Sequence, residues 1–474
     1  MKPQSLAFKE NSTRALGDAD LQKSMQRMRV HYIGGITSAR AKLPEFEALR
    51  DAAKDIKNHT LAHLDLYLEE LERKVTETGG VVHWATTAAE ARNIIEGICR
   101  KANARTVTKG KSMISEEIAL NAHLEKAGFK VVETDLGEYL IQIRNEPPSH
   151  IIGPAVHLTR DQIEADFRRV HKHLPATRNI TEPTALVDEA RKVLRQEFIA
   201  ADVGITGANF LIAETGTSVI VTNEGNGDLT QSLPRVHVVL ATIEKVVPTL
   251  EDVSTILRVL ARSATGQEIS NYTTFSTGPK RGGDPDGPEE YHLVLLDGGR
   301  TEILGSEFRE ALRCIRCGAC MDHCPVYHAV GGHSYGWVYP GPIGAVVTPA
   351  LIGIAEAKHL PHASTFCGRC EEVCPMRIPL PKMMRYWRQH DYAMAKTSEL
   401  PQRALRLWAW LAKRPALYHR ATRIGARLLR LTSGQKGLSR SLPFTQSWMK
   451  HRDFPAPEGG TFQAQWAKRR GGRT

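Results

Sequence analysis

The chain has 474 residues, a length that favours two or three domains, and its 41% hydrophobic and 24% charged content lies near the averages of globular proteins. These values exclude wholesale disorder, and no apolar run approaches the eighteen or so residues of a membrane-spanning helix. The formal net charge of +11 comes mainly from a basic C-terminal region, which would attract nucleic acid, an anionic membrane surface or an acidic partner, or would keep the chain soluble as a solvated face. Residues 1–28 lack the apolar core of a secretory signal, so the expected location is the cytoplasm.

The first three hundred residues predict a helical lead-in followed by an α/β domain. Residues 1–75 are expected to be helical because Leu61, Leu64, Leu68 and Leu71 recur at helical spacing. From residue 76 to residue 300, short apolar runs alternate with helical stretches such as 88–101, a pattern typical of an α/β layer. The strand candidates, which one central sheet covered by helices would hold, are 80–84, 130–133, 210–213, 218–222, 237–242 and 292–296. The stretch 276–290 is rich in Gly and Pro and predicts a surface loop.

Two further segments complete the expected organisation. Residues 301–382 hold most of the cysteines and are expected to begin on a helix at 307–313. Residues 383–474 are basic and Trp-rich, and the spacing of Leu405, Trp408, Leu411 and Leu417 indicates amphipathic helices. The predicted fold class is therefore α/β, followed by a helical di-cluster ferredoxin-type domain and a basic helical C-terminal segment.

The cysteines are crowded, since only Cys99 of the eight lies outside the interval from Cys314 to Cys374. In a long chain without a secretory signal, crowded cysteines more often bind metal or do redox chemistry than form disulfides. The first motif is Cys314-x2-Cys317-x2-Cys320-x3-Cys324-Pro, which is the spacing of the bacterial ferredoxin run. In that run the fourth cysteine ligates a neighbouring cluster, so two clusters are expected.

The second motif, Cys367-x2-Cys370-x3-Cys374-Pro, repeats the end of the first, but Ser364 occupies the position of its opening cysteine. Aligning the two prolines assigns four thiolates to cluster one and three to cluster two: Cys314, Cys317, Cys320 and Cys374 for the first, and Cys324, Cys367 and Cys370 for the second. The fourth iron of cluster two is then held by Ser364, by another side chain or by a partner's group, or the site holds a three-iron cluster.

Two alternatives concern the cysteines themselves. Zinc sites also use C-x2-C pairs, but three cysteines at two-residue spacing followed by Cys-Pro favour iron. Cys99 lies on the apolar side of a predicted helix, which indicates a buried, inert thiol.

Several motif blocks together carry a resemblance to a known family. They are CIRCGACMDHCPVY, CGRCEEVCPMRIPL, KGKSMISEEI, ETDLGEYLIQI and AETGTSVIVTNEGNGDL. Over nearly its whole length the chain resembles the lactate utilization protein B family. The resemblance implies an iron-sulfur subunit, with two 4Fe-4S clusters, of a bacterial system that oxidises L-lactate to pyruvate. It also implies two partners, a cysteine-rich redox subunit and a second, smaller protein with the same α/β domain.

The family's α/β domain is similar to the sugar-isomerase and CoA-transferase-like superfamily, which implies a ligand cleft near residues 109–112 and 214–217. Read from the residues alone, the second segment is equally a hairpin turn between two apolar runs. The first would receive an anion at a helix start, or is a polar loop.

Three functions fit the sequence. The first is an electron-transfer subunit of an L-lactate-oxidising complex. The second is a direct lactate dehydrogenase with substrate in the α/β domain, although no Gly-rich dinucleotide fingerprint follows a strand. The third is an iron-sulfur regulator whose basic tail binds nucleic acid, for which no helix-turn-helix or RNA-binding signature is present. The tail, with Trp408 and Trp410 beside Lys and Arg, also suits peripheral contact with the inner face of a membrane.

Overall fold

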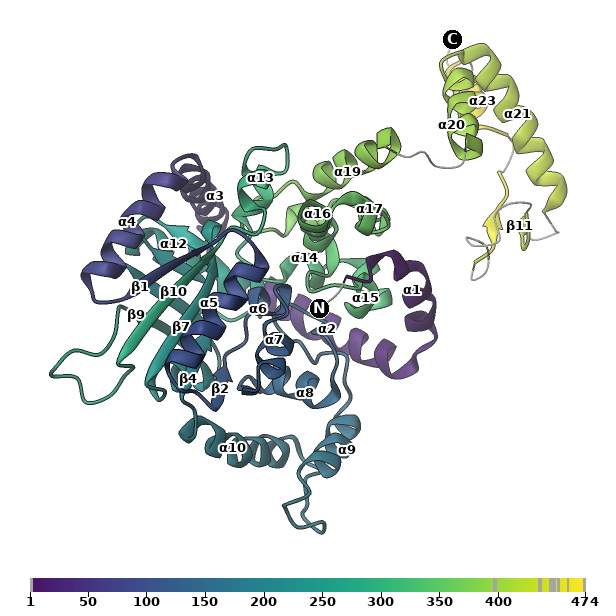
Figure 1. The fold of residues 1–474 in the computed structure, drawn as a ribbon. Coiled ribbons are helices and arrows are strands. Elements are labelled where there is room, and N and C mark those ends of the chain that lie inside the picture. Colours follow the sequence, from purple (N-terminus) through teal and green to yellow (C-terminus); the bar gives the residue numbers. More distant parts are fainter. Residues whose placement is uncertain are drawn as a thin grey trace. The chain divides into compact units, whose positions relative to one another are not determined.

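The computed structural model describes residues 3–394, 399–433, 437–442, 449, 452–457 and 460–471 (Figure 1). The chain divides into two compact units, residues 1–393 and 394–474, which are treated separately below.

The lead-in is helical, as predicted. It consists of a 3₁₀ turn and four helices, η1 (Ser5–Ala7), α1 (Phe8–Gly17), α2 (Ala19–Ala41), α3 (Phe46–Ala62) and α4 (Leu64–Glu77). The leucines that predicted it are buried, and His63 separates α3 from α4. Asp18 caps α2 by accepting a hydrogen bond from the Leu21 N–H, which satisfies a backbone donor that the helix start would leave free.

A six-stranded parallel sheet forms the centre of the α/β domain, in the order β1-β10-β7-β4-β2-β3. Its strands are β1 (Val81–Ala85), β2 (Thr106–Lys109), β3 (Lys130–Glu133), β4 (Val203–Thr206), β7 (Val236–Thr242) and β10 (Glu290–Leu296). Every residue of β4 and β7 is buried, as expected for parallel strands that are covered on both faces. The covering and connecting helices are α5 (Ala88–Lys101), α6 (Met113–Glu117), α7 (Leu120–Lys126), α8 (Leu136–Arg144), α9 (Arg160–Val170), α10 (Pro183–Ile199), α11 (Asn226–Ser232), α12 (Leu250–Ala264) and α13 (Arg300–Leu304), with the 3₁₀ turn η2 (Ile243–Lys245).

One prediction about this domain is wrong, because a single sheet does not hold all the strands. The candidates at 210–213 and 218–222 form β5 (Phe210–Ile212) and β6 (Thr217–Thr222), an antiparallel hairpin. They belong to a second, four-stranded sheet in the order β8-β5-β6-β9, completed by β8 (Val246–Val247) and β9 (Tyr272–Ser276). The breaker-rich stretch lies between β9 and β10 and is largely exposed, in agreement with a surface loop.

The cysteine-rich region is built from short helices. They are η3 (Arg309–Arg313), α14 (Ala319–Asp322), α15 (Pro325–Val330), η4 (His333–Tyr335), α16 (Gly341–Ile352), α17 (Ile354–Ala357), η5 (Leu360–His362), α18 (Arg369–Glu372) and α19 (Leu380–Met394). The helix expected at 307–313 is the shorter 3₁₀ helix η3. The buried side chains of this region share one apolar cluster with residues of the lead-in and of the second sheet.

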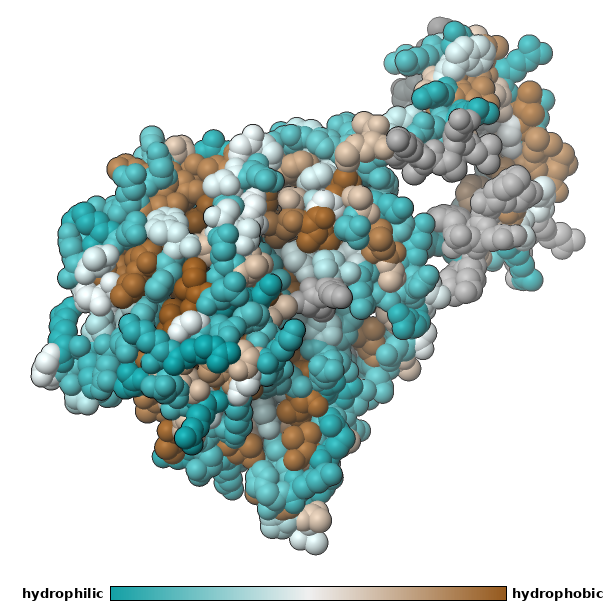
Figure 2. Space-filling view, in the orientation of Figure 1, coloured by the Kyte–Doolittle hydropathy of each residue, from teal (hydrophilic) through white to brown (hydrophobic). Residues whose placement is uncertain are grey.

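The second unit holds the amphipathic helices α20 (Glu399–Ala412) and α21 (Pro415–Thr432), the strand pair β11 (Leu438–Ser439) and β12 (Phe454–Pro455), and α23 (Phe462–Gly471). Apolar side chains lie among hydrophilic ones on its surface, as brown patches in Figure 2. In the described part of the chain, no helix is both long enough and apolar enough to cross a membrane.

Candidate iron-sulfur site

Two loops with nearly the same backbone carry the cysteine motifs. In the first, Arg316 and Gly318 have φ values of 59° and 78°. In the second, Phe366 and Gly368 hold the matching positions, with φ values of 56° and 82°. A non-glycine residue at positive φ is uncommon, so the same unusual geometry at the same motif position indicates that both loops are wrapped to serve the same purpose.

The residues two positions before Arg316 and Phe366 are matched as well. The Arg316 N–H donates to the Cys314 Sγ at 3.4 Å. In the second loop the Phe366 N–H donates to the Ser364 Oγ at 3.1 Å. The serine oxygen therefore stands in the second loop where the cysteine sulfur stands in the first.

Backbone N–H groups also donate to the two cysteines that directly precede a proline. The Tyr327 N–H donates to the Cys324 Sγ, and the Ile378 N–H donates to the Cys374 Sγ, each at 3.5 Å. Such N–H···S bonds stabilise thiolate charge and are one of the ways in which a protein sets the potential of an iron-sulfur cluster.

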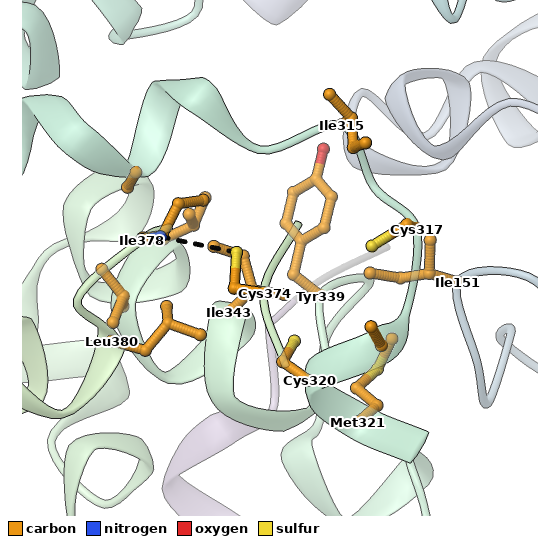
Figure 3. Close-up of a cluster of buried hydrophobic side chains, with 14 of the residues drawn as sticks. Ile151, Ile315, Cys317, Cys320, Met321, Tyr339, Ile343, Cys374, Ile378 and Leu380 are labelled. Carbon is orange, nitrogen blue, oxygen red and sulfur yellow. Dashed lines mark hydrogen bonds between the residues drawn. The ribbon is translucent and has the colours of Figure 1, made fainter. Parts of the chain in front are cut away.

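One group of thiols joins the first motif to the last cysteine of the second. Burial raises the pKa of Cys317, and the charges of Cys374 and Cys314 raise it further. Burial also raises the pKa of Cys320 well above its usual value, as do Cys314, Cys317, Cys370 and Cys374. Figure 3 shows Cys317, Cys320 and Cys374 within one set of buried side chains, although Cys374 lies more than fifty residues further along the chain.

The remaining cysteines form a second group. Burial raises the pKa of Cys324. Hydrogen bonds from the Tyr327 and Val326 N–H groups lower it, and the charge of Cys367 raises it. The pKa of Cys370 is raised to about 12, mainly by burial and next by the charges of Cys324 and Cys367. Cys370 also acts on Cys320 of the first motif, so thiols of both motifs lie close together, and the assignment of each cysteine to one cluster stays a prediction.

This donor set fits iron-sulfur chemistry. Thiols that raise one another's pKa cannot all ionise unless positive charge is supplied, and a bound metal centre supplies it. A 4Fe-4S cluster takes one thiolate on each iron, so its ligands surround the cluster. Within the described ranges, no group of three or more His, Cys, Asp or Glu side chains is placed to hold a single metal ion. Cys99 is fully buried and its pKa is raised to about 12, as expected for an inert thiol.

The two groups differ in exposure. In the first group Cys317, Cys320 and Cys374 are buried and Cys314 is half-buried. In the second group Cys324 is buried, Cys370 is half-buried and Cys367 is exposed. The second group therefore reaches the surface of its unit at Cys367.

Two arginines of the lead-in contribute to the site, and sequence reasoning missed both. Arg50 on α3 is buried and donates to the carbonyl oxygen of Cys374 at 2.7 and 3.1 Å. Arg40 on α2 donates to the carbonyl oxygen of Val373 at 2.7 Å. Their charge lowers the pKa of nearby thiols, Arg50 at Cys374 and Arg40 at Cys317, against the larger upward effect of burial. No local pattern distinguishes these arginines from the solvated ones beside them.

A charged network links the first cysteine loop to the α/β domain. Arg300 forms a two-pronged ion pair with Glu117, with both N–O distances 2.6 Å, and the Tyr339 hydroxyl donates to the same carboxylate at 2.5 Å. The Arg316 guanidinium lies over the Tyr339 ring, 4.3 Å from its centroid, and 3.7 Å from Glu244. Arg316, which belongs to the cysteine loop, is thereby held against the end of the sheet.

A cavity of about 390 Å³ opens beside this network, at the carboxyl ends of β2, β4 and β7. Gly110, Lys111 and Ser112 line it, as the resemblance implied, whereas none of residues 214–217 does. Glu214 instead accepts a hydrogen bond from the Leu250 N–H at the start of α12. Lys109 is buried outside the lining, in an ion pair of 2.6 Å with Glu133.

Comparison with known proteins finds matches to three consecutive regions of the chain. Residues 68–296 match the LUD domain model, residues 310–378 match a 4Fe-4S dicluster domain, and residues 380–471 match the C-terminal domain of lactate utilisation protein B. The fold and the two cysteine loops define a dicluster iron-sulfur protein joined to a parallel-sheet α/β domain.

The relatives identify the family. An uncharacterized electron transport protein from Escherichia coli is 40% identical over 99% of this chain and 98% of its own length. Lactate utilization protein B from Lysinibacillus sphaericus is 40% identical, with the same coverage, and its namesake from Shouchella clausii is 41% identical over 98% of this chain and 97% of its own length. The chain belongs to the lactate utilization protein B family. Among solved structures, a DUF162 family protein from Deinococcus radiodurans has a TM-score of 0.29 and 16% identity over 49% of this chain and 98% of that chain, which is too low to indicate a shared fold.

Proposed function

We propose that this protein is an electron-transfer subunit that acts in the oxidation of L-lactate to pyruvate through two 4Fe-4S clusters. The observation that supports the proposal is the proximity of thiols from the two motifs, since the charge of Cys374 raises the pKa of Cys317 and the charge of Cys324 raises the pKa of Cys370. The names of its relatives supply the link to lactate and to electron transport. When bound, the clusters supply one-electron transfer, while this chain supplies ligands, burial and hydrogen bonds.

The proposed ligands of cluster one are Cys314, Cys317, Cys320 and Cys374. Those of cluster two are Cys324, Cys367 and Cys370, with the Ser364 oxygen as the fourth. In support of Ser364, its hydroxyl accepts the same backbone hydrogen bond as the Cys314 sulfur, on a loop with the same sequence of positive φ angles.

The difference in exposure suggests a direction for the electrons. The thiols of cluster one lie next to the charged network at the end of the sheet, and those of cluster two reach the surface at Cys367. We propose that electrons leave near Cys367 toward a partner. The partners proposed from the family are a cysteine-rich redox subunit and a second α/β-domain subunit.

The test is anaerobic iron and sulfide analysis with electron paramagnetic resonance, on the chain alone and with its partners. We expect about eight irons and about eight acid-labile sulfides per chain, and cluster signals that L-lactate changes only when the partners are present. Stoichiometric zinc without acid-labile sulfide would contradict the proposal.

A second candidate function is direct oxidation of lactate by this chain, which the cavity beside Arg316 favours. The same measurement separates the two functions. Reduction of the clusters by L-lactate in the isolated chain would support direct oxidation, and reduction only in the presence of partners would support the electron-transfer subunit.

For location, we propose a cytoplasmic protein whose C-terminal unit makes peripheral contact with an anionic membrane surface. Helices α20 and α21 expose Leu407, Trp408, Trp410 and Leu431 among arginines. Aromatic and apolar side chains beside basic ones suit the interfacial region of a membrane that carries anionic lipids.

A further inference from the structure

The cavity at the end of the sheet is built from both the α/β domain and the cysteine loop. Its floor comes from the segments that follow β2, β4 and β7, where parallel α/β sheets commonly bind ligands. Arg316 and Tyr339 close it from the cysteine-rich side. With a volume of about 390 Å³ it falls within the usual range of small-molecule sites.

The end of the cavity near the cysteine loop has more cations than partners for them. Arg300 is neutralised by its two-pronged pair with Glu117. Glu244 is left to face Arg316 at 3.7 Å and Arg300 at 3.8 Å, both beyond hydrogen-bond distance. The Lys245 amine lines the cavity and forms no hydrogen bond or ion pair with any described residue.

The guanidinium of Arg316 also has a hydrogen-bond donor without a partner among the described residues. Its Nη1 atom is buried and has no hydrogen-bond partner among the described residues. An unpaired buried donor of a charged group is costly, so a ligand that accepts from it is stabilised. Lys245 and Arg316 both line the cavity, and burial together with the charge of Arg316 lowers the pKa of Lys245 to about 8.

Two acidic residues also line the cavity. Asp135 and Glu224 line it, and after burial Asp135 is the next influence that raises the pKa of Glu224. The amine of Lys111, the remaining basic residue of the lining, donates a hydrogen bond to the carbonyl oxygen of Ile152. A ligand carboxylate would therefore be attracted toward Arg316 and Lys245 and away from the carboxyl groups of Asp135 and Glu224.

We infer that this cavity binds a small organic acid, whose carboxylate is held by Arg316 and Lys245 beside the loop that carries Cys314 and Cys317. A carboxylate supplies two acceptors in a plane that matches a guanidinium and an ammonium. The choice of a 2-hydroxy or 2-oxo acid as the ligand rests on the proposed function, whereas the carboxylate site itself rests on the charges of the cavity.

The experiment is isothermal titration calorimetry of the anaerobically purified full chain with L-lactate, pyruvate and inorganic phosphate. Lys245→Gln removes a cation without touching the cysteine loop, and Lys280→Gln, in the exposed loop before β10, is the matched control. We expect Lys245→Gln to raise the Kd of the tighter organic acid at least about tenfold, since a charge-assisted hydrogen bond is lost, while Lys280→Gln leaves it unchanged.

Iron and sulfide content is measured on each variant, because binding and cluster assembly are separate readouts. Arg316→Gln serves as the second variant and is expected to weaken binding similarly. The inference is overturned if neither organic acid binds the wild-type chain, if both bind Lys245→Gln as tightly as the wild type, or if phosphate binds as tightly as the better acid. Since binding needs no turnover, it can hold even if the clusters prove not to carry electrons from lactate, and the two proposals fail separately.

Discussion

Ser364 occupies in the second cysteine loop the position that Cys314 occupies in the first, on a backbone of nearly the same conformation. A serine oxygen on iron is a harder donor than a thiolate, so cluster two should differ from cluster one in its electronic properties. We predict that Ser364→Ala lowers the iron content from about eight to about seven per chain, with the spectrum of a three-iron cluster. Ser364→Cys should keep the full content but change the paramagnetic resonance spectrum.

The control for this prediction is Thr365→Ala, which changes the exposed neighbour and should leave both iron content and spectrum unaltered. If Ser364→Ala retained every iron and an unchanged spectrum, the serine oxygen would not be a ligand, and the fourth position of cluster two would have to be filled from elsewhere.

Arg50 acts on the same chemistry through charge. Reduction adds negative charge to a cluster, and a buried cation nearby favours the reduced state. We predict that Arg50→Gln lowers the midpoint potential of cluster one by on the order of 50 mV, which corresponds to about 1 kcal/mol for one electron, and that Arg50→Lys shifts it less. Anaerobic redox titration followed by paramagnetic resonance measures the shift, and a potential that stays constant or rises would refute this role for Arg50.

At the scale of the element, strand β4 tolerates no side chain at one point. A Cβ on Gly204 would stand 1.8 Å from the Thr230 carbonyl oxygen of α11, whereas Gly97, in the exposed face of α5, has nothing within 4 Å. We predict that Gly204→Ala lowers the free energy of unfolding by about 2–3 kcal/mol through overpacking. Gly97→Ala should raise it by about 0.5–1 kcal/mol, because alanine is the better helix former. Chemical denaturation of both variants tests the contrast, and equal effects of the two substitutions would contradict it.

The elements also show what sequence reasoning can reach. Helix α5 and strand β3 were predicted at their observed bounds because their patterns are local. Strands β2 and β4 were missed, and they contain Lys109 and Gly204, which are residue types depleted in strands. The hairpin β5–β6 was recognised but placed in the wrong sheet, because sheet membership depends on pairing with β8 and β9 and not on the strand's own residues.

The same distinction holds for the candidate site. Motif spacing predicts that the cysteines within each motif lie together because the chain between them is short, whereas the exchange of Cys324 and Cys374 between the clusters is predicted only by aligning the two prolines. The contacts of Arg40 and Arg50 with the second motif span more than three hundred residues and have no sequence signal. Lys245 and Arg316 likewise come together only when the cysteine loop packs on the end of the sheet.

At the scale of the molecule, the α/β domain and the cysteine-rich region share one unit and hold each other through buried polar contacts. His150, from the segment after α8, and Asp322 of α14 are both buried, and the His150 Nε2 lies 3.1 Å from the Asp322 carboxylate. The His150 Nδ1 accepts hydrogen bonds from the Ile152 and Gly153 N–H groups. The proton of a neutral His150 therefore lies on Nε2, which donates a hydrogen bond to Asp322. A cavity and two proposed clusters that share such a frame would be kept at fixed distances, as stepwise electron transfer requires.

The C-terminal unit has a surface of another kind, and its prediction concerns association. The exposed side chains of Trp408 and Trp410 would enter the headgroup region while neighbouring arginines attract anionic lipid. We predict that the full chain floats with vesicles containing anionic phosphatidylserine at low salt, and that about 0.5 M salt releases it because exposed charges are then screened. Replacing both tryptophans with Ser should weaken flotation about tenfold or more, whereas Trp84→Ser, an exposed tryptophan of the first unit, should not. Equal flotation with purely zwitterionic vesicles, or none at low salt, would contradict this prediction.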